Sequence, residues 1–217
     1  MRAWSYSALT KFETCPKQFY ETRVAKRVVE PETEQLRWGN AVHKALERRA
    51  KEGAPLPTGM TQWEAMMRAL DQTPGELLAE SQFAITQDFE QTQWFDKSVW
   101  LRAVIDYGRV SDKSILALDY KTGKPKPDTD QLRLFAGVLL RLYPQIEKAV
   151  TGYVWLKTKQ IQKEVFTRAD LDAIWGGFLP RVARLQQAYQ DDAWPAKPSG
   201  LCRGWCPVTS CEFFQHR

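Results

Sequence analysis

The run Ile115-Leu-Ala-Leu-Asp-Tyr-Lys121 decides how this chain is expected to fold. Its apolar residues predict a buried strand, and the stretch Thr122-Gly-Lys-Pro-Lys-Pro-Asp128 that follows predicts a loop. Side chains two positions apart on a strand point to the same face, so Asp119 and Lys121 are expected to project together. A carboxylate beside an ammonium group at a strand end suits phosphodiester hydrolysis, and it equally suits a surface salt bridge.

The preceding run, Trp100-Leu-Arg-Ala-Val-Ile-Asp106, also ends in an aspartate. If the two runs pair as an antiparallel hairpin around the loop 111–114, Asp106 and Asp119 become direct cross-strand neighbours. Like charges that face each other destabilise a sheet unless a cation lies between them. The two aspartates therefore predict a metal site at this end of the sheet.

Hydrophobic periodicity predicts the remaining elements. Strands are expected over residues 78–86, 99–107, 115–121, 149–157 and 160–167. Helices are expected over residues 5–20, with Ser7 as its cap and a break at Cys15-Pro16, and over 36–52, 61–70 and 131–143. A last helix is opened by Thr167 with Asp170 in capping-box spacing. This order predicts an α/β fold with a central mixed sheet flanked by helices.

The helix over 36–52 is expected to bury one side, made of Trp38, Val42, Ala45 and Leu46. The segment from Trp194 onward is rich in Pro, Gly and Cys and shows no periodicity.

The composition is that of an ordinary globular protein, with 43% hydrophobic and 26% charged residues. Residues 1–9 lack the apolar core of a secretory signal, and no run approaches a membrane span, so we expect a cytoplasmic protein with no membrane partner. The whole excess of positive charge lies in residues 1–51, which carry 11 Lys and Arg against 6 Asp and Glu. That excess permits a polyanionic partner, and it equally describes a solvated basic helix face.

Four cysteines occur, three of them within ten residues of one another: Cys15, Cys202, Cys206 and Cys211. In a cytoplasmic chain of this size such a group suggests metal ligation and not a disulfide scaffold. Four thiolates suit an iron–sulfur cluster or tetrahedral zinc, and four unligated thiols are the third alternative.

Asp106, the triplet Asp119-Tyr-Lys121 and Gln131, in this order, resemble the PD-(D/E)XK nuclease superfamily, and specifically its RecB-like branch. The stretch Trp38-Gly-Asn-Ala-Val-His43 looks like the Gly-x-x-x-His element of that branch, whose histidine is a metal ligand. Glu80 lies where the family often has a glutamate on its first strand.

The stretch Gln131-Leu-Arg-Leu-Phe135 is similar to the Gln-x-x-x-Tyr motif of the same branch, with phenylalanine in place of tyrosine. The resemblance implies a restriction-endonuclease-like core and a Mg²⁺- or Mn²⁺-dependent deoxyribonuclease. It implies an exonuclease that acts on single-stranded DNA, in preference to an endonuclease.

The resemblance also implies roles for individual residues. The implied ligands of the metal are His43, Asp106, Asp119 and the carbonyl of Tyr120. The implied catalytic residues are Asp106, Asp119, Lys121, Glu80 and Gln131. Lys121 would orient the attacking water and stabilise negative charge.

The cysteines resemble those of the iron–sulfur exonucleases of this branch, which include the nuclease associated with CRISPR adaptation and the AddB-type nucleases. Their tail commonly runs C-x2-C-x5-C, whereas this one runs C-x3-C-x4-C over the same span. The resemblance implies a 4Fe–4S cluster held by Cys15, Cys202, Cys206 and Cys211, with zinc as the alternative. It also implies DNA as a partner, together with a helicase or a recombination or CRISPR protein.

We therefore expect one nuclease domain over residues 1–217, with its catalytic core in 36–167. Residues 1–30 and 194–217 would form the cysteine subregion, in which the C-terminal tail is tied to the N-terminal helix. Two other readings stay open: a catalytically silent DNA-binding accessory protein with a structural metal site, and a zinc-stabilised interaction module.

Overall fold

The computed structural model describes residues 2–216, which divide into two compact units. One unit joins the N-terminal segment up to Thr33 with the C-terminal segment from Gly177 onward, and the other comprises residues 34–176. Met1 and Arg217, the two ends of the predicted single domain, lie outside the described residues. Within the described part of the chain, no helix has the length and apolar character needed to cross a membrane.

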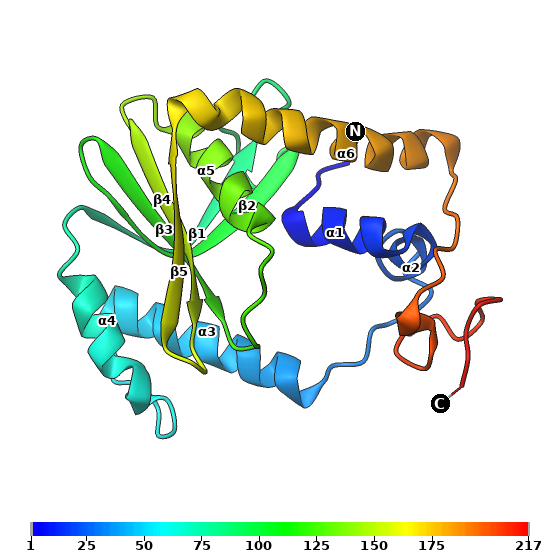
Figure 1. Cartoon of the computed structure of the whole chain (residues 1–217), viewed down its shortest axis with the longest axis horizontal. Coiled ribbons are helices and arrows are strands. Elements are labelled where there is room, and N and C mark those ends of the chain that lie inside the picture. The colour runs from blue at the N-terminus through cyan, green and yellow to red at the C-terminus, as the bar shows by residue number, and fades with distance from the viewer. Residues whose placement is uncertain (1, 217) are drawn as a thin grey trace. The chain divides into compact units, whose positions relative to one another are not determined.

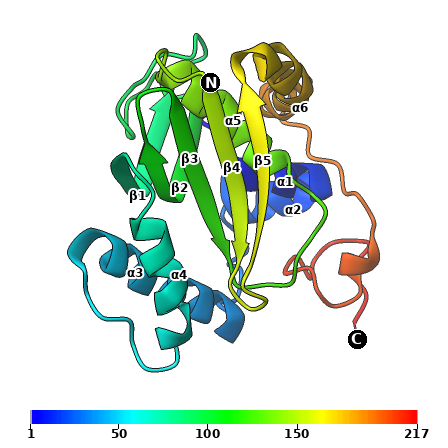
Figure 2. The same ribbon diagram turned by 60° about the vertical axis from the view of Figure 1, so that its left-hand side comes forward.

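The second unit is built on a five-stranded sheet of order β1-β2-β3-β4-β5 (Figure 2). The strands are β1 (Glu76–Ile85), β2 (Leu101–Val110), β3 (Ser114–Lys121), β4 (Lys148–Trp155) and β5 (Gln160–Thr167). All neighbouring pairs are antiparallel except β3 and β4, which are parallel. Helix α5 (Asp130–Leu142) supplies the crossover that a parallel pair requires.

Helices cover both faces of this sheet (Figure 1). On one face lie α3 (Glu34–Glu52), a 3-10 turn (Thr61–Trp63) and α4 (Glu64–Asp71). There Leu46 of α3 belongs to the same buried cluster as Leu118 of β3. On the other face Leu132 of α5 is buried with Tyr153 of β4. The predicted mixed sheet flanked by helices is thus confirmed.

The predicted register of the β2–β3 hairpin is also confirmed. Its recorded pairs run from Val110 opposite Ile115 to Tyr107 opposite Leu118, the frame in which Asp106 faces Asp119. The ladder stops one step before the two aspartates. Beyond that point β2 pairs only with β1, and β3 pairs only with β4. The two strands therefore separate where their carboxylates begin.

Strand β1 brings a third carboxylate to the same place. Ala79 pairs with Tyr107 and Ser81 with Ile105, so the intervening Glu80 lies opposite Asp106. Glu80 itself is absent from the ladder, and its φ of 45° is left-handed, a conformation that costs a non-glycine residue on the order of 1 kcal/mol. Three carboxylates thus lie in a row across β1, β2 and β3.

The first unit consists of short helices and irregular chain. It contains α1 (Tyr6–Thr14), α2 (Pro16–Phe19), a π-helical turn (Tyr20–Val24), most of α6 (Leu171–Asp191) and a 3-10 turn (Gly200–Cys202). The predicted break is present, because Cys15 between α1 and α2 has an extended backbone. The predicted cap was wrong. Ser5 caps α1 in place of Ser7, since its side chain accepts the Ala8 N–H.

The expected burial of Trp38 was also wrong, because 46% of this residue is exposed. Val42 and Leu46 lie one and two turns further along the same stripe of α3, and both are fully buried. The apolar stripe extends toward the N-terminus of α3, beyond the part of the helix that packs on the sheet, and Trp38 lies in this exposed first part. At the other end of the unit, the capping box of Thr167 and Asp170 is present as predicted.

Candidate active site

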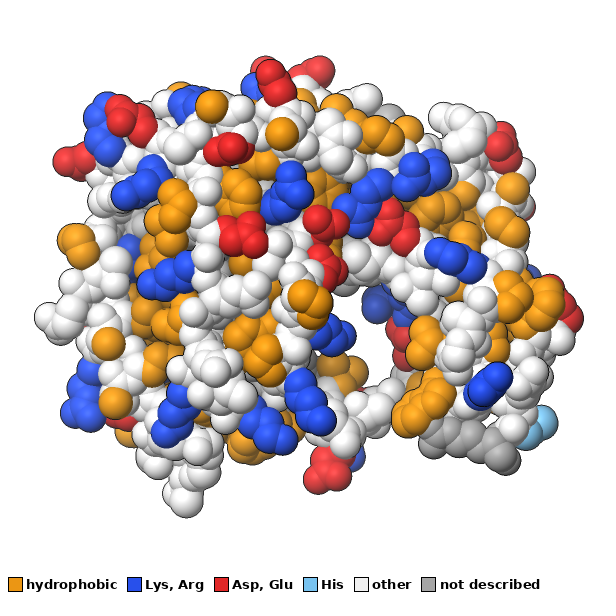
Figure 3. All heavy atoms as spheres, viewed as in Figure 1, with side chains coloured by type: hydrophobic (Ala, Val, Ile, Leu, Met, Phe, Trp, Pro, Cys, Tyr) orange, Lys and Arg blue, Asp and Glu red, His pale blue; other side chains and the backbone are white. Residues whose placement is uncertain are grey.

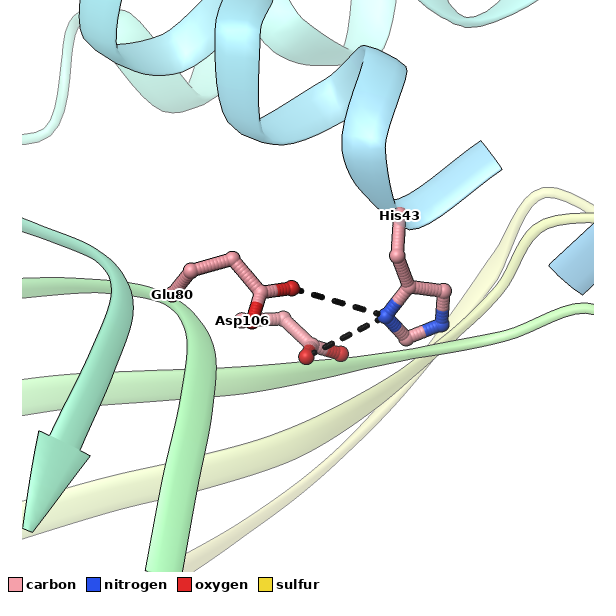
Figure 4. Close-up of side chains that lie close together, drawn as sticks. All are labelled: His43, Glu80 and Asp106. Carbon is pink, nitrogen blue, oxygen red and sulfur yellow. Dashed lines mark ion pairs between the residues drawn. The ribbon is translucent and has the colours of Figure 1, made fainter. Parts of the chain in front are cut away.

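His43 of α3 approaches the row of carboxylates from above the sheet (Figure 4). Its Nδ1 lies 3.2 Å from Asp106 Oδ1 and 3.8 Å from Glu80 Oε1. One potential ligand atom from each of these three residues lies within 4.8 Å of the other two. An imidazole nitrogen and two carboxylate oxygens therefore converge on one point.

The side chain of Asp106 is fixed at the point where β2 and β3 separate. Its Oδ2 accepts the backbone N–H of Tyr120 at 2.6 Å, in the place where the ladder would otherwise have continued. The side chain is buried, and the bond leaves Oδ1 directed at His43. One oxygen of the carboxylate thus accepts a backbone N–H of β3, and the other oxygen remains available to a ligand.

Asp119, Lys121 and Gln131 form a closed triangle next to this group. Gln131, in the first turn of α5, donates from Nε2 to Asp119 Oδ1 at 2.8 Å and accepts Lys121 Nζ on Oε1 at 2.9 Å. Lys121 Nζ also lies 2.7 Å from Asp119 Oδ2. The lysine is further restrained from β4, since its Nζ lies 5.0 Å from the centre of the Tyr153 ring.

The charges of the site oppose one another when no metal is bound. Burial, followed by the neighbouring charge of Asp106, raises the pKa of Asp119 to about 6. Burial acts to lower the pKa of His43, but hydrogen bonds to Asp106 and Glu80 outweigh it and raise the pKa to about 10. With its raised pKa, the imidazole of His43 is protonated at neutral pH and is the cation between Asp106 and Glu80. A divalent ion suits the same place.

One further observation fits a metal. Asp119 Oδ2 is buried and has no hydrogen-bond partner among the described residues. Lys121 is close enough to form an ion pair with it, but it does not have the direction of a hydrogen bond. Carboxylate oxygens with one imidazole nitrogen are a donor set for Mg²⁺ or Mn²⁺. The residues present therefore fit such an ion.

All side chains predicted for the site lie in the second unit. They fall into a ligand group of His43, Glu80 and Asp106 and a triangle of Asp119, Lys121 and Gln131. Tyr120 connects the two groups, because its backbone N–H binds Asp106 and it lies between Asp119 and Lys121 in the chain. It also lines one cleft together with His43, Glu80, Asp106, Asp119 and Lys121.

The sequence reasoning missed Tyr153, because only the parallel pairing of β3 and β4 places it beside Asp119. Phe135, at the tyrosine position of the motif, is buried in the core.

The four cysteines lie in the first unit and line one pocket there. They are Cys15, Cys202, Cys206 and Cys211, and none forms a disulfide. Backbone N–H groups point at two of the sulfurs: Lys197 donates to Cys15 at 3.4 Å and Ser199 to Cys202 at 3.5 Å. Burial, and then the three neighbouring thiols, raise the pKa of Cys206.

Comparison with known proteins gives a fold and a family. The structure is similar to that of the "Putative exonuclease" of Eubacterium rectale, with a TM-score of 0.55, 11% identity, and coverage of 97% of this chain and 86% of that one. For the structure of SSO0001 the TM-score is 0.47 and the identity 12%, over 100% of this chain and 89% of that one. No curated protein sequence matches the chain. The profile of the PD-(D/E)XK nuclease superfamily matches residues 3–211, so the chain belongs to this superfamily.

Proposed function

We propose that the protein is a Mg²⁺- or Mn²⁺-dependent deoxyribonuclease that degrades single-stranded DNA from an end. The observation that carries the proposal is the row of Glu80, Asp106 and Asp119 across three strands, with Lys121 beside it and one buried carboxylate oxygen without a hydrogen bond. Three carboxylates and one lysine leave two negative charges, which a divalent ion would balance once His43 binds it as a neutral imidazole.

His43, Glu80, Asp106, Asp119 and the Tyr120 carbonyl would hold the cation. A bound divalent ion would supply Lewis acidity at the phosphate and would lower the pKa of a water molecule, so that the water can lose a proton and act as the nucleophile. The chain itself positions the other groups. Lys121 orients the attacking water and stabilises negative charge on the phosphate, and Gln131 holds Lys121 and Asp119 at a fixed separation.

The finer parts of the proposal rest on the resemblance to the RecB-like branch. These are the preference for single strands, the action at ends, a cytoplasmic location, and a helicase or a recombination or CRISPR protein as partner. The description of the Eubacterium rectale protein agrees with the action at ends.

We propose further that Cys15, Cys202, Cys206 and Cys211 hold a 4Fe–4S cluster with a structural role. All four thiols line one pocket and none forms a disulfide, and four thiolates can hold such a cluster or a tetrahedral zinc ion. The preference for the cluster rests on the resemblance of the cysteines to those of the iron–sulfur exonucleases, and metal analysis of protein purified without oxygen tests it.

The test of the nuclease uses end-labelled single- and double-stranded oligonucleotides and circular single-stranded DNA, with Mg²⁺, Mn²⁺ or EDTA. We expect metal-dependent shortening of linear strands and survival of the circle. Asp119→Asn and Lys121→Ala should each lower the cleavage rate by at least about 10²-fold while DNA affinity changes only a few-fold. Asp112→Asn, on the exposed turn between β2 and β3, is the matched control.

Cleavage that survives in both active-site variants would contradict the assignment of the site. Wild-type protein that binds DNA but does not cleave it with either metal would point to the accessory protein instead.

A further inference from the structure

Two exposed turns beside the active site carry four lysines, here named the rim lysines: Lys124, Lys126, Lys157 and Lys159. The first two lie in the loop after β3, and the other two lie in the turn between β4 and β5. Because β3 and β4 are parallel, both strands end at the same edge of the sheet, and both views show the turn and the start of the loop together there (Figures 1 and 2). The backbone joins them, since Leu156 donates its N–H to the carbonyl of Lys121 at 2.9 Å.

The charges of the rim lysines are not neutralised by acidic side chains of the described residues. Some other lysines of this unit are neutralised, as Lys113 is by Glu147 and Lys51 by Glu47. Within residues 2–216, by contrast, no carboxylate lies within ion-pairing distance of any rim lysine. Blue Lys and Arg side chains are spread over the face drawn in Figure 3, and several of them lie along its lower left.

The two nearest acidic residues in the sequence do not fill this role. Asp128 accepts the backbone N–H of Asp130 at 3.0 Å, and Asp130 begins α5, where a helix N-terminus stabilises its charge. The rim lysines therefore present their positive charge to solvent.

The tight turn between β4 and β5 gives Lys159 a φ of 56°. This value lies in the left-handed region, where glycine or asparagine is favoured and a lysine costs on the order of 1 kcal/mol.

We propose that the rim lysines bind the phosphates next to the scissile phosphodiester, so that the DNA strand leaves the active site over the ends of β3 and β4. Several exposed ammonium groups, none within ion-pairing distance of a carboxylate among the described residues, suit a ligand with a series of negative charges and without sequence preference. Their turns start beside Lys121, which places the neighbouring phosphates of a bound strand within their reach. This inference rests on the proposed nuclease function and adds the path of the substrate to it.

The test is the salt dependence of binding, measured by fluorescence anisotropy with a single-stranded oligonucleotide and the full chain in EDTA. For single strands the slope of log affinity against log salt is about −0.7 for each phosphate contact. Each Lys→Gln change at the rim should therefore reduce the slope by about 0.7 and weaken binding about fivefold at 0.1 M salt. Lys148→Gln, an exposed and unpaired lysine at the opposite end of β4, should change neither.

Lys159→Asn separates charge from backbone strain. Asparagine tolerates the left-handed conformation, so the melting temperature should stay the same or rise while the salt slope still falls. In cleavage assays the rim variants should raise KM and leave kcat unchanged, because they do not touch the reacting atoms.

Wild-type protein that fails to cleave DNA would overturn the proposed function. Active protein whose rim variants keep the wild-type slope, or lose it for RNA and not for DNA, would overturn the rim alone.

Discussion

The carboxylate site and the cysteine pocket are built in opposite ways. Every side chain of the carboxylate site comes from a strand or a helix whose position is set by hydrogen-bonded ladders and by packing. The cysteines come from the break between α1 and α2 and from a tail in which the described residues form one 3-10 turn and otherwise irregular chain. The sheet can therefore hold its charges in an unfavourable arrangement without a metal, whereas the proposed cluster would contribute more to the order of the cysteine pocket.

This contrast is tested most severely by changing one cysteine. If the proposed cluster is bound, Cys15→Ser and Cys206→Ser should each remove iron and sulfide and lower the free energy of unfolding by about 3–5 kcal/mol, because the cluster would link Cys15 to the C-terminal segment and its binding energy would add to the folding energy. Metal content and the melting temperature measure this. Removing the divalent ion with EDTA should leave circular dichroism unchanged.

Ser210→Ala, next to Cys211, is the control for the cysteine variants. A Cys15→Ser protein that keeps its metal and its melting temperature would end the distinction between the two sites.

A smaller effect concerns the charge that the sheet tolerates. Because the pKa of Asp119 is raised to about 6, its ionised form opposes folding above that pH, and the cost vanishes below about pH 4, where the side chain is protonated in both states. Asp119→Asn should thus stabilise the metal-free protein at pH 7.5 by on the order of 1–3 kcal/mol and have no such effect near pH 4. Denaturation in EDTA at both values measures the difference from wild type. A variant that is less stable than wild type at pH 7.5 would show that the site is not strained.

The smallest effect concerns how the sheet directs Lys121. Tyr153→Leu should lower kcat about tenfold without changing KM, since it removes the ring that restrains the ammonium group, and tenfold corresponds to about 1.4 kcal/mol. Tyr153→Phe keeps the ring and should keep the rate. Trp155→Leu alters the same buried cluster and should cost stability without this loss of kcat. Equal losses of kcat in the two leucine variants would make Tyr153 a packing residue only.

Local patterns were sufficient for part of the fold. Two apolar runs with aspartates at matching positions set the β2–β3 register, and Thr167 with Asp170 set the capping box. The same kind of reasoning failed for Trp38. Helical periodicity identifies an apolar stripe but does not say where the sheet beneath it ends.

Sequence by itself determined which groups are candidates for the chemistry, because alternation along a strand puts Asp119 and Lys121 on one face whatever the strand packs against. Tertiary structure alone decided how those groups meet. The ladder between β2 and β3 opens at Asp106, Glu80 adopts a left-handed backbone opposite it, α3 brings in His43 from far along the chain, and the parallel pairing of β4 supplies Tyr153. The physical reason is that side-chain direction follows from local geometry. Distances between separate elements depend on long-range packing, to which all the intervening residues contribute.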